Sequence, residues 1–195
     1  MTTVIRKADF IDSIADSLQY ISYYHPLDFI QAMEKAYNAE ESQAAKDAIA
    51  QILINSRMSA EGKRPICQDT GIVTCFVKIG MNVQWETDQT VQEMVDEGIR
   101  RGYGFEGNPL RASIVADPAG ARKNTKDNTP GVVHVEMVPG EKVEVMIAAK
   151  GGGSENKSKM VMLNPSDDVA AWVEKTVPTM GAGWCPPGML GIGIG

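Results

Sequence analysis

The stretch RPICQDTGIVTC places a thiol, an amide and a carboxylate in succession at Cys67, Gln68 and Asp69. A cysteine in a polar loop bounded by glycine is a candidate metal ligand or nucleophile, because both roles use the thiolate. A nucleophilic cysteine needs a base nearby, and the only two histidines, His25 and His134, lie in no pattern typical of a base. A metal ligand, a Cys–His nucleophile and a buried structural thiol all remain open from this stretch alone.

The other two cysteines have different surroundings. Cys185 lies in GAGWCPPG, where two prolines fix the backbone and glycines allow close approach. A rigid, shielded thiolate suits a soft metal or an iron–sulfur cluster, and a structural turn is the alternative. Cys75 alternates with Val73 and Val77, so we predict that it packs in the core, with a cluster ligand as the alternative. No Cys-x-x-Cys pair occurs, which argues against a closed four-cysteine zinc site.

A glycine run, KGGGSENKSK, begins where a predicted strand ends. Successive N–H groups at Gly151–Gly153 could form a concavity that binds an anion. The flanking Lys150 and Lys157 favour a small anionic ligand, and a mobile loop is the alternative. The run matches neither the Walker A pattern nor Gly-x-Gly-x-x-Gly.

Two further stretches carry basic side chains. Arg111 lies in NPLRAS, and arginine is suited to bidentate capture of a carboxylate, with a surface salt bridge as the alternative. The polar run ADPAGARKNTKDNTP contains Arg122, Lys123 and Lys126. Most such runs are solvated loops, and a ligand-binding role is the alternative.

The elements that position these stretches begin with helices. Apolar residues recur at helical spacing from Phe10 to Ile21, and His25-Pro26 separates this helix from a second over 27–36. A third helix is predicted from an N-cap at Ser42 to Gly62, which we place just past its end.

The period then changes from helical to alternating. Residues 73–79 predict a strand, and Asp88 is the expected cap of a helix that runs to Ile99. The stretch GVVHVEMVPGEKVEVMIAAKGGG predicts a hairpin that turns at Pro139-Gly140, and Ser166–Asp168 begin a last helix. The expected fold class is α+β: a helical N-terminal layer over 1–62, then a mixed or antiparallel sheet with packed helices over 63–195, in one domain.

Composition excludes several classes of protein. The chain has 195 residues, 43% hydrophobic and 23% charged, which is enough apolar material for a core. The net charge of −6 disfavours nucleic acid and anionic membranes as partners. We find neither a signal peptide nor an apolar run that could span a membrane, and expect a cytoplasmic protein. Three cysteines without an export signal disfavour a disulfide framework.

The chain ends in GMLGIGIG. Glycine alternating with isoleucine predicts a strand or a close-packed turn rather than a terminal tail, which is usually polar. We therefore expect that the chain is a fragment, cut within a domain.

Four of these stretches together resemble the N-terminal (alpha) region of class I, iron–sulfur fumarate hydratases and the related tartrate dehydratase alpha subunit. In chain order they are CQDTG, NPLRASIVADPAGARKNTKDNTP, AAKGGGSENKSK and GAGWCPPG. The resemblance extends from about Val4 to Gly195. It implies a [4Fe–4S] cluster held by three cysteines, with one iron left open for substrate. Cys67 and Cys185 match two ligand positions, and the third ligand of the family comes later than this chain extends.

The resemblance also implies substrate contacts. Arg111 would hold a substrate carboxylate, and Gln68 and Asp69 would hydrogen-bond the substrate, with Asp69 in the proton-transfer network. The backbone N–H of Gly153 would contact substrate. These assignments suit water addition to a dicarboxylate, which needs a Lewis acid, a carboxylate clamp and a proton shuttle.

The sequence thus predicts an iron–sulfur hydro-lyase that interconverts fumarate and (S)-malate, represented by the N-terminal part of its cluster-binding domain. The expected partners are a small dicarboxylate substrate, a C-terminal (beta) domain or subunit, fused or separate, and a second copy of the chain in a homodimer. One alternative is the alpha region of a tartrate dehydratase. The other is an inert fragment that lacks the third cluster ligand.

Overall fold

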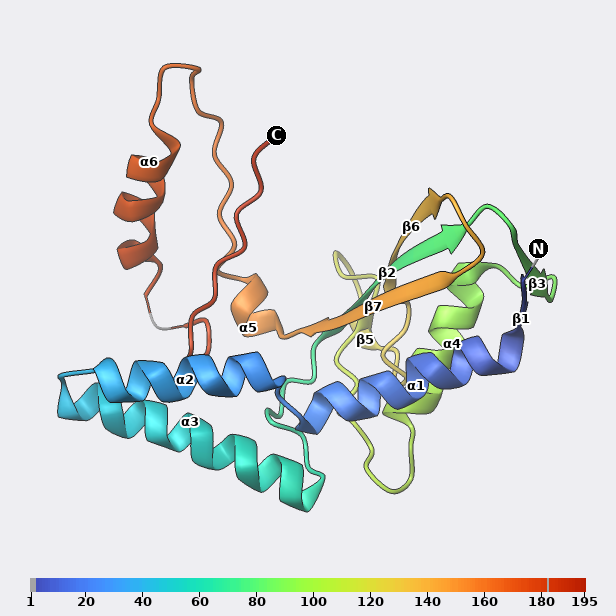
Figure 1. Ribbon diagram of the computed structural model, residues 1–195, viewed down its shortest axis with the longest axis horizontal. Helices are drawn as coiled ribbons and strands as arrows, with labels where there is room; N and C mark the ends of the chain where they lie inside the picture. Colours follow the sequence, from blue (N-terminus) through green and yellow to red (C-terminus); the bar gives the residue numbers. More distant parts are fainter. Residues whose placement is uncertain (1–2, 182) are drawn as a thin grey trace. The chain divides into compact units, whose positions relative to one another are not determined.

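The computed structural model describes residues 3–181 and 183–195 (Figure 1). These residues form two compact units, of which the first ends at Lys150 and the second begins at Gly151. Among the described residues, no helix combines the length and apolarity that crossing a membrane requires. The predicted division of one domain into a helical part, residues 1–62, and a part with a sheet and packed helices, residues 63–195, stays a prediction.

The predicted helices of the first unit are all present. They are α1 (Lys7–Tyr23), α2 (Leu27–Ala39), α3 (Gln43–Gly62) and α4 (Val91–Tyr103). Pro26 stands at the N-cap of α2, where its missing N–H costs no helical hydrogen bond. Helices α2 and α3 run side by side in Figure 1.

Two predicted helix ends were wrong. Helix α4 is capped by Thr90 and not by Asp88: Thr90 Oγ1 accepts a hydrogen bond from the backbone N–H of Glu93, whose carboxylate accepts one from the Thr90 N–H. This reciprocal pair satisfies two free N–H groups at once, which a lone aspartate would not do. Helix α3 includes Gly62, and Lys63 follows it in the left-handed conformation that usually favours glycine.

The α+β class is confirmed, and the main sheet is mixed. Its strands are β2 (Ile72–Gly80), β6 (Val132–Val138) and β7 (Val143–Lys150), in the order β6-β2-β7. Strand β2 pairs parallel with β6 and antiparallel with β7. Two small ribbons accompany it: β1 (Thr3–Arg6) parallel to β3 (Val83–Glu86), and β4 (Val115–Ala116) antiparallel to β5 (Lys123–Asn124).

The predicted hairpin of β6 and β7 is wrong, because β2 lies between these two strands (Figure 1). Val77 of β2 faces Val135 on one side and Val145 on the other. Strand β2 carries the fully buried residues of the sheet, and a central position gives such a strand hydrogen-bonded neighbours on both edges. The sequence-adjacent strands therefore occupy opposite edges.

The core of the first unit lies between one face of this sheet and helices α1 and α4. Alternate residues of β2 point into it, as the predicted strand required. Its buried apolar residues are Phe10, Ile11, Ile14, Leu18, Val73, Cys75, Val77, Ile79, Met94, Val95, Ile99, Tyr103 and Leu110.

Helices α1 and α4 approach closely because α4 has a glycine where they cross. A Cβ added at Gly98 would lie 2.6 Å from the Cβ of Ile14. We predict that Gly98→Ala lowers the free energy of unfolding by about 1–3 kcal/mol, because the added methyl forces the helices apart. Gly62→Ala is the matched control, since its Cβ would meet only ordinary contacts. It should leave stability unchanged or raise it by less than about 1 kcal/mol. Urea unfolding of both variants, followed by circular dichroism, measures the difference; equal effects would contradict the packing argument.

The second unit contains α5 (Gly152–Glu155), α6 (Val169–Thr176) and one turn of 3₁₀ helix, η1 (Val177–Met180). The predicted start of α6 is confirmed, since the Asp168 carboxylate accepts hydrogen bonds from the N–H groups of Ala170 and Ala171. The strand or close-packed turn predicted at the end of the chain is not formed. Residues 189–195 form no regular element, and Ile192 and Ile194 are 58% and 79% exposed.

Candidate active site

The loop that follows α3 carries three of the predicted site residues. Cys67 is partly buried, and the backbone N–H of Asp69 points to its Sγ at 3.5 Å. The thiol lies 3.6 Å from Oε1 of Gln68, whose side chain is exposed. The loop therefore presents a thiol, an amide and a carboxylate within three consecutive residues, as the sequence predicted.

Cys67 and Asp69 line a cavity of about 150 Å³. Its other walls come from α1, from Tyr103 at the end of α4 and from the segment that follows α4; they are Leu18, Ile21, Ser22, Ile66, Thr70, Tyr103, Leu110 and Ala149. The walls are mostly apolar with a few polar groups, which is typical of a small-molecule site. Its volume is below the range of drug-sized sites and suits a small ligand.

Glycine is required where this loop joins the sheet. Gly71 has φ +85°, and a Cβ there would lie 2.7 Å from the backbone N and C of Lys150. Both the conformation and the approach of β7 exclude a side chain at this position. The glycine in CQDTG thus fixes how the loop enters β2.

The backbone of Arg111 is hydrogen-bonded to this loop. Thr70 Oγ1 donates a hydrogen bond of 2.7 Å to the carbonyl oxygen of Arg111, and Leu110 lines the cavity. The Arg111 side chain is exposed, and none of the described carboxylates forms an ion pair with it. This observation disfavours the surface salt bridge that we considered and leaves the guanidinium for a ligand.

Sequence reasoning missed two residues that hold the loop. The Tyr103 hydroxyl donates to the carbonyl oxygens of Thr70 (2.8 Å) and Gly71 (3.1 Å). Burial, opposed by the hydrogen bond to Thr70, raises the pKa of Tyr103 to about 12, so the hydroxyl remains a donor at neutral pH. The amide of Asn128, which is fully buried, also donates to the Gly71 carbonyl at 3.0 Å. Tyr103 lies beyond Ile99, where the predicted helix ended, and Asn128 lay inside a run that looked solvated.

The rest of that run is solvated, as predicted. The side chains of Arg122, Lys123 and Lys126 are exposed, and the Arg122 guanidinium donates to the Pro118 carbonyl. The short β4–β5 ribbon interrupts the run. The buried Asn128 is the exception, and its left-handed φ of 62° is one that asparagine tolerates better than most residues.

In the second unit, the structure brings the glycine run and GAGWCPPG together. A Cβ at Gly153 would lie 3.8 Å from the Sγ of Cys185 and 3.6 Å from the carbonyl oxygen of Gly183. The Ser154 hydroxyl contacts the Trp184 carbonyl at 3.4 Å. Cys185 is exposed and adopts φ 48°. Gly153 therefore lies close to the Cys185 thiol and to the backbone of Gly183.

The remaining candidates have structural roles. Cys75 is fully buried, and burial, with a smaller contribution from the Asp96 charge, raises its pKa to about 11. Such a thiol stays protonated and packs as predicted. His25 Nδ1 lies 2.9 Å from Ser56 Oγ, and the ring of His134 stacks on Phe76. Neither histidine is paired with Cys67 in the described part of the chain, so the Cys–His nucleophile has no support here.

The thiols can be compared with what an iron–sulfur cluster requires. Over residues 3–181 and 183–195, no group of three or more His, Cys, Asp or Glu side chains gathers as a metal site within the chain. Cys67 at its cavity and Cys185 beside Gly153 are accessible sulfur donors, the ligand type such clusters use. Cys75 does not fit, because it is sealed in the core. Cys67 and Cys185 are therefore each the type of donor that such a cluster uses, and Cys75 is not.

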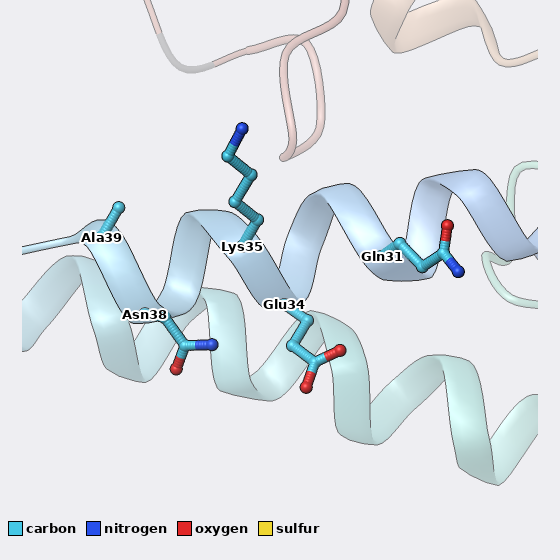
Figure 2. Close-up of a pocket in the computed structure, with 5 residues that line it drawn as sticks. All are labelled: Gln31, Glu34, Lys35, Asn38 and Ala39. Atoms are coloured by element: carbon cyan, nitrogen blue, oxygen red, sulfur yellow. The ribbon is translucent and has the colours of Figure 1, made fainter.

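A more open hollow, of about 500 Å³, lies on α2 (Figure 2). It is lined by side chains from one helix: Gln31, Glu34, Lys35, Asn38 and Ala39. None of the motif residues lies there, and Figure 2 shows these side chains diverging along the helix rather than converging on one point. A set of groups that act on one ligand must converge, so we place the candidate site at the cavity beside Cys67.

Comparisons with known proteins identify the family of the chain. The family model described as "Fumarate hydratase (Fumerase)" matches residues 11–195. The chain is 32% identical over 192 residues to "Putative L(+)-tartrate dehydratase subunit alpha" of Methanocaldococcus jannaschii, covering 94% of this chain and 66% of that protein. It is 27% identical over 188 residues to L(+)-tartrate dehydratase subunit alpha of Escherichia coli strain K12, covering 93% of this chain and 60% of that protein. The chain thus spans less than two thirds of the length of these relatives. The match over nearly the whole chain shows that it belongs to the fumarate hydratase (Fumerase) family.

Proposed function

We propose that this protein is a hydro-lyase that reversibly hydrates a small dicarboxylate, interconverting fumarate and (S)-malate, and that the chain carries part of its cluster- and substrate-binding domain. The observation that carries the proposal is the Cys67–Thr70 loop: Cys67, Asp69 and Thr70 line a small cavity, and Thr70 Oγ1 donates a hydrogen bond to the backbone carbonyl of Arg111. A sulfur donor, a carboxylate and a guanidinium are the groups that such a reaction uses.

Each proposed residue has a role that its chemistry supports. The Arg111 guanidinium binds one substrate carboxylate in a bidentate manner. Gln68 hydrogen-bonds the substrate and orients it. Asp69 hydrogen-bonds the substrate and belongs to the network that moves the proton removed from, or added to, the carbon next to the hydroxyl-bearing one. The backbone N–H of Gly153 donates to the substrate, which the absence of a side chain permits.

The proposed cofactor is a [4Fe–4S] cluster with Cys67 and Cys185 as two of its ligands. When bound, it supplies a Lewis-acidic iron that favours breaking of the C–O bond. The apolar walls beside Cys67 would limit water around the substrate, which strengthens the contacts of Asp69. The third ligand and further catalytic groups are proposed to come from outside residues 1–195.

Tartrate dehydration is the second candidate, because the relatives named above are tartrate dehydratase alpha subunits. Their names also support the proposal that a beta domain or subunit completes the enzyme, and we further propose a homodimer. Turnover of fumarate, (S)-malate and L(+)-tartrate by the native protein, purified without oxygen, distinguishes the candidates. Turnover of tartrate without malate would replace our first choice, and turnover of none would overturn the hydro-lyase proposal.

We expect the activity to be lost in air and recovered with ferrous iron and a reductant. An iron that substrate can reach is one that oxygen can reach, and Cys67 and Cys185 are both accessible. The measurement is diacid turnover before aeration, after aeration and after anaerobic repair. Full activity after prolonged aeration would contradict an exposed cluster.

A further inference from the structure

Asn128 joins two segments that are far apart in the sequence. Its side chain is fully buried, and its Oδ1 accepts hydrogen bonds from the backbone N–H groups of Ser113 (2.8 Å) and Ile114 (3.4 Å). Its Nδ2 donates to the carbonyl oxygen of Gly71 at 3.0 Å. One amide thus connects the end of the Cys67 loop to the segment that carries Arg111.

Three other hydrogen bonds support the same junction. The Tyr103 hydroxyl donates to the carbonyls of Thr70 and Gly71, and Thr70 Oγ1 donates to the carbonyl of Arg111. The bonds that Tyr103 and Asn128 donate to Gly71 are buried, and a buried hydrogen bond is costly to break because it leaves a polar group without a partner. Together these contacts fix the Cys67–Gly71 loop in one position against the Arg111 segment.

We propose that Asn128 is a positioning residue that sets Asp69 and Arg111 in register for the same substrate. This inference rests on the roles proposed above for these two residues. The hydrogen bonds that the Asn128 side chain forms within the described residues all go to backbone groups, and the side chain is fully buried, so it acts through the loop and not on the substrate. Its amide is suited to the task, because it offers a donor to one segment and an acceptor to the other.

The chemistry of the amide gives a selective test. Asn128→Asp keeps an acceptor for Ser113 and replaces the donor to Gly71 by a second acceptor, and aspartate tolerates the left-handed conformation of this position. Asn128→Gly removes both connections and also tolerates that conformation. Asn124→Asp is the matched control: the Asn124 amide donates to the Ala112 carbonyl in the same segment, and neither of its hydrogen bonds within the described residues goes to the Cys67 loop.

Amide hydrogen exchange of the native protein measures whether Asn128 connects the Cys67 loop to the Arg111 segment, and it does not depend on enzyme activity. In Asn128→Asp, the peptide covering residues 64–72 should exchange faster, while Ser113 stays protected. In Asn128→Gly, both segments should exchange faster. Asn124→Asp should leave residues 64–72 unchanged. An unchanged rate over residues 64–72 in both Asn128 variants would overturn the proposal.

Turnover then separates positioning from mere stability. Asn128→Asp should lower kcat/KM by about 10–100-fold, the scale of a misplaced reacting group, with bound iron unchanged. In an Asp69→Asn background, Asn128→Asp should lower kcat/KM by less than about two-fold, because the carboxylate that it would displace is already absent. An equal loss in both backgrounds would overturn the proposal. If the wild-type protein turns over no diacid, the proposed function fails, and the exchange measurement still decides whether Asn128 couples the segments.

Discussion

Replacing Cys67 by alanine is expected to abolish both cluster binding and diacid turnover in the native protein. Cys67 is an accessible sulfur donor at the cavity, and alanine offers no atom that can bind iron. Because the side chain is only partly buried, the substitution should cost little stability. The measurement is iron and acid-labile sulfide per chain after anaerobic reconstitution, together with turnover and the thermal midpoint.

Cys75→Ala is the matched control for this prediction. Cys75 lies eight residues later, is fully buried in β2 and has a pKa of about 11. Its replacement should leave iron content and turnover close to those of the wild type, at a cost of about 1 kcal/mol for the small cavity. The reverse pattern, with iron lost in Cys75→Ala and retained in Cys67→Ala, would show that our assignment of the ligand is wrong.

Asp69→Asn should lower kcat by about 10²–10⁴-fold, the usual contribution of a positioned proton-transfer group. The amide is nearly isosteric and keeps hydrogen-bonding capacity, so KM and iron content should change little. Steady-state kinetics with (S)-malate and fumarate, and an iron assay, measure these quantities.

The control for Asp69 is Asp88→Asn, which makes the same change in an exposed loop before α4. It should leave kcat unchanged. A loss in Asp69→Asn that appears only in KM would assign Asp69 to substrate binding and contradict its place in the proton-transfer network. A kcat within about two-fold of the wild type would remove Asp69 from the mechanism.

The sequence identified those elements whose signal is local. Helices α1, α2 and α3 follow from apolar spacing, and β2 follows from the alternation of Val73 to Ile79. The order β6-β2-β7 did not follow, because it depends on pairing between distant segments. Pro139-Gly140 marks a true turn, but a turn does not specify whether its strands pair with each other or with a third strand.

The same distinction, between what local patterns predict and what depends on distant segments, applies to the candidate site. The motif around Cys67 and the glycine run were visible because a cysteine among polar residues and three successive glycines both stand out in a sequence. The structure adds which of them meet: Thr70 with Arg111 in the first unit, and Gly153 with Cys185 in the second. Asn128 could not be singled out, because the sequence does not say which asparagine of a polar run is buried. Burial and long-range partners appear only once the chain is folded.

The central claim is that Cys67 and its neighbours form the metal and substrate site of a diacid hydro-lyase. The most direct test is turnover of fumarate and (S)-malate by the native protein, measured without oxygen as a function of bound iron. We predict that turnover rises in proportion to iron and is absent in iron-free protein. Full turnover in iron-free protein, or none in protein with a complete cluster, would contradict the account.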